Sequence, residues 1–251
     1  MKLIKHIALM MFLAGIAACA TAPNQGSPSD AAALARAKAH TDLGAAYFQQ
    51  NKLEVALGEF AEAIQAYPNY PLAYNGMGLV RAALGENAEA EANFKKAIQL
   101  QPNSSESHNN YGNFLCNTGR YDESIVQFMD AVKNPLYSTP NLAYANAGIC
   151  SARKKDFASA EAYLNKALQL NPLTHSAAYQ LAEIQFARGN AESAQKTLQN
   201  ALVSGPGPEV LWLGIRIARA MGNKDDEASY ALQLRRQYPN SEQTRLLLSG
   251  Q

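Results

Sequence analysis

The sequence lacks the charge imbalance and the short motifs that mark several functional classes. Its 251 residues include 22 lysines and arginines against 21 aspartates and glutamates, so it has no basic field that would attract nucleic acid. The motifs His-Glu-x-x-His, Cys-x-x-Cys and Gly-x-Ser-x-Gly and a phosphate-binding glycine loop do not occur in it. We therefore expect no enzyme activity, no metal or cofactor, and no nucleic-acid partner.

Long hydrophobic runs and strand-like alternation are also missing. The apolar stretch near the N-terminus, Ile7 to Ala18, has twelve residues. As a helix it would span about 18 Å, too short for the roughly 30 Å of a bilayer core. Lys2 and Lys5 precede it, which is the pattern of an export signal. One interpretation is a simple secretory signal that is cleaved after Ala18.

The residues around Cys19 favour another interpretation. The Ile-Ala-Ala that precedes this cysteine resembles the lipobox of bacterial lipoproteins. The resemblance implies that residues 1–18 are removed and that Cys19 is lipidated and becomes the N-terminus. It also implies that Ala20 permits sorting to the outer membrane. Several acyl chains on one residue anchor a protein stably, because each buried methylene contributes about 0.8 kcal/mol.

The segment after this cysteine has the composition of a tether. Residues 19–30 contain proline, glycine and serine without apolar periodicity, which predicts a flexible linker. Asp30 precedes an alanine-rich run and is a candidate helix N-cap. The folded domain is expected over residues 31–251.

An internal repeat organises this domain. Gly44, Gly78 and Gly112 lie 34 residues apart, and Gly148 follows after 36. Alanine or serine recurs in the same phase at positions 56, 90, 124, 160, 194 and 228. Proline recurs in this phase at positions 68, 102, 172 and 206. This period resembles the tetratricopeptide repeat, in which each unit is a pair of antiparallel helices. The resemblance implies an all-α fold, a right-handed superhelical solenoid of about six helix pairs, with units at 37–70, 71–104, 105–138, 141–174, 175–208 and 209–242.

Two places depart from a uniform repeat. A two-residue expansion of the connection Asn134 to Pro140 explains the step of 36. The sixth unit keeps Trp212, Ala228 and Leu232 in phase but has Arg219 where an aromatic residue is expected. Terminal repeats are usually atypical, so we expect this unit to cap the solenoid.

Histidine and cysteine are both scarce. His40 and His108 occupy the same repeat position, where a packing residue belongs, and a metal role is the weaker alternative. Cys116 and Cys150 lie on the first helices of neighbouring units, which pack about 8–10 Å apart. Side chains that point toward one another at this spacing meet disulfide geometry. The prediction is a Cys116–Cys150 disulfide, and the alternative is two small buried thiols.

The concave face offers a candidate binding groove. In tetratricopeptide proteins, positions two, five, six, nine, twelve and thirteen of each first helix face this side. Asparagine is a poor helix former, so a cluster of asparagines there needs an external reason. An amide both donates and accepts, which suits it to binding an extended peptide backbone. The alternative is a solvated polar face. The candidate groove residues are Phe48, Leu72, Asn75, Leu79, Asn109, Asn110, Asn113 and Asn146.

Three strings resemble one subfamily more closely. They are N-N-Y-G-N-F-L followed by G-R-Y-D-E-S, L-W-L-G-I-R-I-A-R-A, and A-S-Y-A-L-Q-L-R-R-Q-Y-P. They resemble type IV pilus biogenesis and stability lipoproteins, which act as pilotins for the outer-membrane secretin. The resemblance implies that the lipid on Cys19 anchors the protein in the outer membrane, facing the periplasm. It also implies that the groove binds secretin subunits and promotes their localisation and multimerisation, which pilus extrusion and twitching motility require. The alternatives are a general envelope scaffold, for example an adaptor for peptidoglycan enzymes, and an enzyme whose site is not recognisable.

Overall fold

The computed structural model describes residues 28–203 and 205–250, and these form thirteen α-helices and no strand. The predicted signal segment 1–18, Cys19 and most of the tether lie outside the described residues. In chain order, the helices are α1 (Pro28–Gln49), α2 (Leu53–Ala66), α3 (Pro71–Ala83), α4 (Asn87–Leu100), α5 (Ser105–Asn117), α6 (Tyr121–Ala131), α7 (Pro140–Arg153), α8 (Phe157–Leu170), α9 (His175–Ala187), α10 (Ala191–Leu202), α11 (Pro208–Met221), α12 (Lys224–Gln237) and α13 (Glu242–Leu248).

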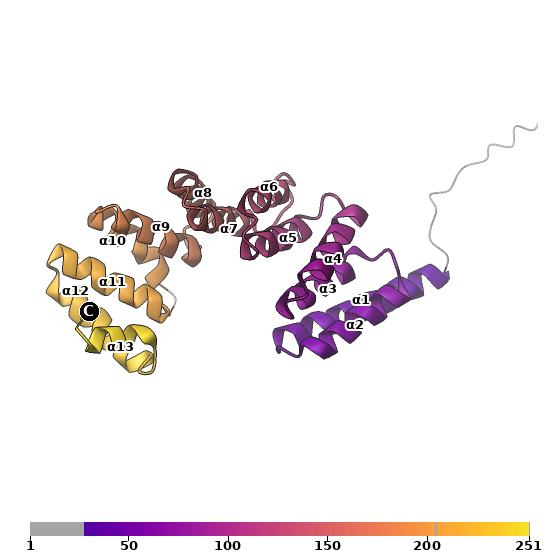
Figure 1. Cartoon of the computed structure of the whole chain (residues 1–251), viewed down its shortest axis with the longest axis horizontal. Coiled ribbons are helices and arrows are strands. Elements are labelled where there is room, and N and C mark those ends of the chain that lie inside the picture. The colour runs from indigo at the N-terminus through magenta and orange to yellow at the C-terminus, as the bar shows by residue number, and fades with distance from the viewer. Residues whose placement is uncertain (1–27, 204, 251) are drawn as a thin grey trace, which may run out of the picture.

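The helices stack as antiparallel pairs along a curved path. Each helix contacts only helices one or two places away along the chain, so the molecule is an open arch (Figure 1). Helices α3, α5, α7 and α9 lie on its inner side. The predicted all-α superhelical solenoid is confirmed. Within the described part, no helix is both long and apolar enough to cross a membrane.

Glycine lets the two helices of a pair approach closely. A Cβ built on Gly112 would lie 2.7 Å from the Phe128 ring, and one on Gly78 would lie 2.9 Å from the Phe94 ring. Both rings are fully buried. The repeating glycine of the sequence is therefore the position against which the large side chain of the second helix packs.

The turn between the two helices of each pair recurs with the period of the sequence repeat. One residue per turn has a positive φ, and these residues are Asn51, Gly85, Gly119, Lys155, Gly189 and Gly222. Their spacings are 34, 34, 36, 34 and 33 residues. The step of 36 crosses the connection between α6 and α7, where the sequence predicts the expansion. The last step is one residue shorter than the repeat predicts.

This shorter step corrects the predicted register of the sixth unit. The repeat phase predicts that Leu232 is buried, yet it is 61% exposed, and Ala228 is exposed as well. Ala231 and Leu234 are buried instead. The unit begins at Pro208, which follows the N-cap Gly207, rather than at 209. One residue rotates a helix face by about 100°, so this single deletion moves both predicted core positions toward solvent.

The first helix begins earlier than the sequence predicts. Residues 28–30 belong to α1 and not to a flexible tether, because this helix starts at Pro28 and has Asp30 in its first turn. Asp30 is therefore not the N-cap. Proline is favoured at the start of a helix, and a carboxylate in the first turn interacts favourably with the helix dipole.

A short helix that the repeat pattern does not predict covers the C-terminal end. Helix α13 packs on α11 and α12, where Leu247 contacts the cluster that contains Leu234. The Thr244 hydroxyl donates to the Tyr238 carbonyl oxygen at 2.7 Å. The cap of the solenoid is thus α13 in addition to the sixth pair.

Candidate partner-binding site

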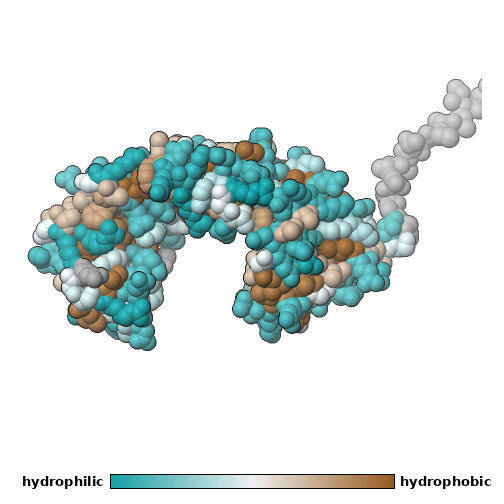
Figure 2. Space-filling model, viewed as in Figure 1, coloured by the Kyte–Doolittle hydropathy of each residue, from teal (hydrophilic) through white to brown (hydrophobic). Residues whose placement is uncertain are grey.

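The predicted apolar groove residues gather at one pocket between α1 and α3. Phe48, Leu72, Asn75 and Leu79 all line a cavity of about 280 Å³. We call this cavity the N-terminal pocket. Figure 2 shows hydrophobic surface on this end of the arch, whereas the middle is mostly hydrophilic. The repeat positions alone therefore identify residues that the fold brings together.

Two further residues shape this pocket, and both occupy repeat positions that face the concave side, Thr41 the fifth of its unit and Gly76 the sixth. Gly76 lets the Phe60 ring, which is buried at the bottom of the cavity, pack closely against α3, because a Cβ at that position would lie 2.2 Å from the ring. Thr41 is 8% exposed, and its hydroxyl has no hydrogen-bond partner within the described residues. The pocket is thus mostly apolar, with Gln49, Asn75 and Glu106 also in its lining and one buried hydroxyl that lacks a partner within the described residues.

The predicted asparagines mostly bind one another across neighbouring repeats. The Asn110 amide donates to Asn75 Oδ1 at 3.4 Å, and the Asn146 amide donates to Asn109 Oδ1 at 3.1 Å. These bonds connect the first helices α3, α5 and α7. Four of the predicted asparagines therefore connect neighbouring repeats along the concave side.

Asn113 differs from its neighbours. It is half-buried on α5, and no hydrogen bond of its side chain is found in residues 28–203 and 205–250. Among the predicted asparagines it is the one whose side chain makes no hydrogen bond within the described residues.

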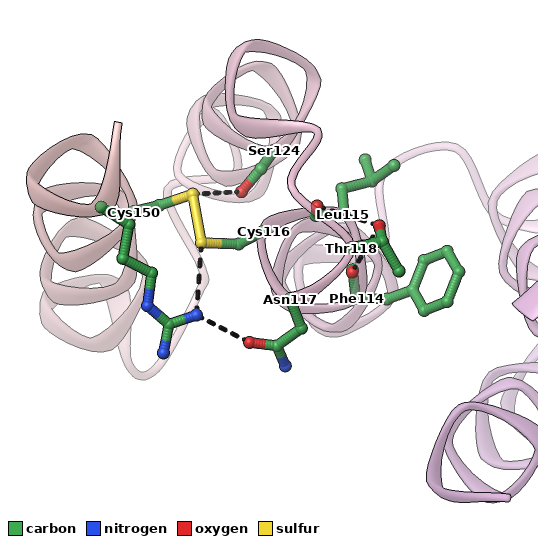
Figure 3. Close-up of a disulfide and its surroundings, with 8 residues drawn as sticks. Phe114, Leu115, Cys116, Asn117, Thr118, Ser124 and Cys150 are labelled. Carbon is green, nitrogen blue, oxygen red and sulfur yellow. Dashed lines mark hydrogen bonds between the residues drawn. A yellow bond between two sulfur atoms is a disulfide. The ribbon is translucent and has the colours of Figure 1, made fainter. Parts of the chain in front are cut away.

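Cys116 and Cys150 are joined by a disulfide between α5 and α7, with Cα atoms 5.8 Å apart. Both residues are buried, and Ser124 Oγ lies 3.3 Å from Cys150 Sγ (Figure 3). Arg153 Nη1 donates to Asn117 Oδ1 at 2.8 Å beside the bridge. Cys116 therefore faces its partner cysteine rather than the open groove.

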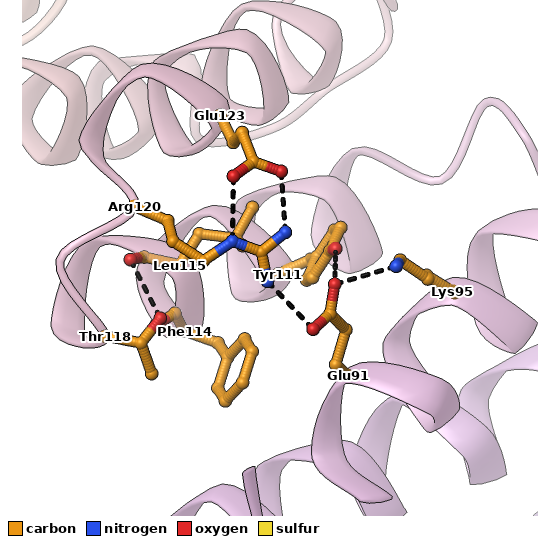
Figure 4. A network of polar contacts seen from close by, with 8 residues as sticks. All are labelled: Glu91, Lys95, Tyr111, Phe114, Leu115, Thr118, Arg120 and Glu123. Atoms are coloured by element: carbon orange, nitrogen blue, oxygen red, sulfur yellow. Dashed lines mark hydrogen bonds and ion pairs between the residues drawn. The ribbon is translucent and has the colours of Figure 1, made fainter. Parts of the chain in front are cut away.

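An ion-pair network ties the second repeat to the third (Figure 4). The Arg120 guanidinium donates to both oxygens of Glu123 and to Glu91 at 2.8 Å. Lys95 and the Tyr111 hydroxyl also donate to Glu91. These partners, Lys95 first, lower the pKa of Glu91 to about 2. Burial, with the neighbouring Glu91, raises the pKa of Tyr111 to about 12.

The two histidines that share a repeat position also share a structural role. Nδ1 of His40 lies 2.8 Å from Glu59 Oε2, and Nδ1 of His108 lies 2.8 Å from Gln127 Oε1. Glu59 and Gln127 occupy equivalent positions on the second helices. In the described part of the chain, no group of three or more potential metal ligands is found.

The C-terminal half of the concave side holds another, smaller cavity, which we call the C-terminal cavity. Its volume is about 190 Å³, and Glu183, Phe186 and Arg216 are among its lining residues. The Arg216 guanidinium lies 5.0 Å from the centre of the Phe186 ring, a favourable cation–π distance. The repeat rule places Glu183 and Phe186 on the concave side, but the one-residue slip of the sixth unit obscures Arg216.

Comparison with known proteins identifies the family. Residues 24–71, 71–104, 93–126 and 152–213 each match a tetratricopeptide repeat profile. The sequence is 30% identical to the type IV pilus assembly protein PilF of Pseudomonas aeruginosa, over 93% of this chain and 94% of that protein. The chain belongs to the tetratricopeptide repeat family.

Two solved structures agree with this assignment. The first, described as PilW, a widely conserved type IV pilus biogenesis factor, is 32% identical, with a TM-score of 0.74 over 84% of this chain and 98% of that one. The second, Pseudomonas aeruginosa PilF, is 27% identical, with a TM-score of 0.76 over 88% of this chain and 99% of that one. The tetratricopeptide repeat protein described here is thus a homologue of two type IV pilus biogenesis factors.

Proposed function

We propose that this protein is an outer-membrane lipoprotein that acts as a pilotin for the secretin of the type IV pilus. The observation that carries the proposal is the similarity to PilF over 93% of the chain. The resemblance of the sequence around Cys19 to a lipobox supports the anchoring, and the concave pockets support the binding of a partner. In this proposal the protein works by binding rather than by catalysis.

The mechanism follows from an anchor and a groove. The acylated Cys19 would hold the arch at the inner face of the outer membrane. The N-terminal pocket would accept apolar side chains of a secretin segment, while Asn113 would bond to its backbone. Holding several subunits near the membrane raises their local concentration, which favours ring assembly.

The anchoring is tested by Cys19→Ala, with secretin multimers in the outer membrane as the readout. We expect the multimers to be lost or to move to the inner membrane, because the variant cannot be acylated. Ala20→Ser is the matched control, since it keeps the cysteine and should leave the multimers intact. Unchanged multimers in Cys19→Ala would contradict lipid-directed pilotin function.

The groove is tested by Leu72→Asp, which places a charge at the N-terminal pocket. We expect the variant to reach the outer membrane but to capture less secretin. Val55→Asp is the control, because Val55 is also exposed in the first turn of a helix, α2, but does not line the pocket. Equal secretin capture by both variants would argue against this pocket as the contact.

A general envelope scaffold remains the rival proposal. It is favoured if deletion of the gene leaves both secretin multimers and pili normal.

A further inference from the structure

A different cavity adjoins the N-terminal pocket at the edge of the concave face. Its volume is about 300 Å³, and it lies between the start of α5 and the connection from α6 to α7. We call it the edge pocket. Leu72 and Glu106 line both cavities, so the two pockets lie next to each other.

The expanded connection supplies the outer wall of the edge pocket. Leu136 in this connection is 88% exposed, the highest value among the large hydrophobic residues of the described part. Asn134 orders the connection, because its Oδ1 accepts from the Leu136 amide at 3.0 Å and its Nδ2 donates to the Asn103 carbonyl at 3.4 Å. The insertion that breaks the repeat period thus presents an apolar side chain beside the groove.

The inner wall carries a buried polar group without a partner. Ser105 is 7% exposed, and its hydroxyl has no hydrogen-bond partner in the described structure. An unsatisfied buried hydroxyl costs free energy that a bound group recovers when it hydrogen-bonds. Thr41 has the same property in the N-terminal pocket. Each of the two cavities is therefore lined by one buried hydroxyl that lacks a partner within the described residues.

Glu106 sets the charge between the two cavities. It is exposed at the second position of α5, and no ion pair is found for its carboxylate within residues 28–203 and 205–250. Lys38 and Asp42 occupy concave repeat positions on α1, but neither lines the two pockets. The carboxylate of Glu106 therefore favours a basic group at the junction of the two pockets.

We infer that the concave face binds an extended peptide segment that carries a lysine or arginine next to an apolar residue. The apolar side chain occupies the N-terminal pocket, and the basic side chain lies at Glu106. The chain then continues into the edge pocket, where its backbone bonds to the Ser105 hydroxyl and contacts Leu136. An extended chain advances about 3.3 Å per residue, so the apolar and basic residues lie within a few positions of each other. This inference rests on the proposed binding of a partner segment in the groove.

A displayed library of random linear peptides, selected on the purified lipidated protein in detergent, tests the inference. We expect the enriched peptides to combine an aliphatic or aromatic residue with lysine or arginine within three positions. Glu106→Lys should exchange this preference for aspartate or glutamate, and it should weaken the best basic peptide about tenfold. Glu106→Gln serves as a second variant in case the charge reversal impairs folding, and it should remove the basic preference without creating an acidic one.

Glu192→Lys is the matched control. Glu192 is exposed and occupies the second position of α10, as Glu106 does in α5, but it lines neither pocket. The Glu192→Lys variant should therefore select the same peptides as the wild type. Ser105→Ala should weaken the best peptide severalfold, because the hydroxyl bond is lost while the charge stays.

Three outcomes overturn the inference: no enriched peptide, no basic preference, or a basic preference that Glu106→Lys leaves intact. None of these depends on Cys19 or on the secretin multimers. A failed peptide selection with normal dependence of the multimers on Cys19 would reject the inference but leave the pilotin proposal standing. If the selection gives the expected peptides but the secretin multimers do not depend on Cys19, the inference stands and the pilotin proposal is rejected.

Discussion

At the scale of single residues, the groove depends on glycines that make room for Phe60. A Cβ on Gly76 would lie 2.2 Å from Cε1 of this ring, a separation that real atoms do not tolerate. Phe60 is 2% exposed, so its ring has little space to move. Gly76 therefore serves both the packing of α2 against α3 and the depth of the N-terminal pocket.

We expect Gly76→Ala to destabilise the protein by about 1–3 kcal/mol, because the added methyl group overpacks this junction. Thermal unfolding of the purified variant measures the effect. Gly58→Ala is the matched control, since Gly58 is also in a helix but a Cβ at its position would have no atom within 4 Å. It should stabilise by about 0.5–1 kcal/mol through helix propensity. Equal effects of the two variants would contradict the packing argument.

Acid stability should depend on Glu91. Its pKa is lowered to about 2 by Lys95, Arg120 and Tyr111, below the ordinary value of 4.5. A carboxylate with a lowered folded-state pKa stabilises the fold fully above the unfolded-state value. This contribution is lost as the pH falls from about 4.5 toward 2. The loss would loosen the contact between the second and third repeats.

The midpoint of thermal unfolding, measured from pH 6 to pH 2.5, tests this dependence. Glu91→Gln should lower stability by about 1 kcal/mol at neutral pH and should flatten the fall in the midpoint below pH 4.5. Glu192→Gln removes an exposed carboxylate outside the network and should keep the wild-type profile. A Glu91→Gln profile parallel to wild type would show that this carboxylate is not linked to acid unfolding.

At the scale of helices, the repeat period predicts most elements but not the irregular ones. The spacing of glycine and alanine is enough to place α3 to α10, because each helix must bury the same face against its predecessor. Helix α13 has no counterpart in the repeat, and the one-residue slip before α11 is hidden because Trp212 still falls on a plausible position. The early start of α1 at Pro28 follows from local helix-start chemistry rather than from the period.

For the groove as well, the repeat period predicts some features but not others. Position in the repeat is sufficient for Phe48, Leu72 and Leu79, since each first helix presents the same positions to the concave side. The pairing of Asn109 with Asn146 is not predictable, because it depends on the offset between neighbouring helices. Sequence position gives the face of a helix, and only the structure gives its partner across the groove.

The disulfide between α5 and α7 should stabilise the junction at the expanded connection. Its cysteines are 34 residues apart in sequence, and the chain-entropy model gives a stabilisation of about 4 kcal/mol for such a loop. We expect Cys116→Ala with Cys150→Ala to lower the unfolding free energy by about 2–4 kcal/mol, and reduction of the wild type to have a similar effect.

Thiol titration of the unfolded, unreduced protein checks the bridge itself. No reactive thiol other than an unmodified Cys19 should appear, and two more would show that the cysteines are free. The double variant should not respond to reductant, which separates loss of the bridge from other effects of reduction.

At the scale of the whole molecule, the solenoid has one concave pocket in each half and a polar centre between them. Both pockets combine apolar with charged lining residues, Glu106 in the N-terminal pocket and Glu183 and Arg216 in the C-terminal cavity. Because each helix contacts only near neighbours, the halves have no direct packing against each other. The asparagine bonds and the disulfide at α3, α5 and α7 add to helix packing and to the Arg120–Glu91 ion pair in fixing how the halves are oriented.

Because packing is local, removing a helix at one end of the solenoid should destabilise only the helices next to it. A chain that ends at Asn240 lacks α13, which contacts only α11 and α12. Leu234, which is fully buried in the intact protein, would become partly exposed to solvent. This exposure should lower the local stability by about 2 kcal/mol. Amide hydrogen exchange in α11 and α12 should therefore accelerate about thirtyfold, while exchange in α3 to α6 stays unchanged. Leu248→Ser, at a position 70% exposed, should change neither. Faster exchange throughout the truncated chain would mean that the arch unfolds as one unit, and the N-terminal pocket would then depend on a helix at the opposite end of the molecule.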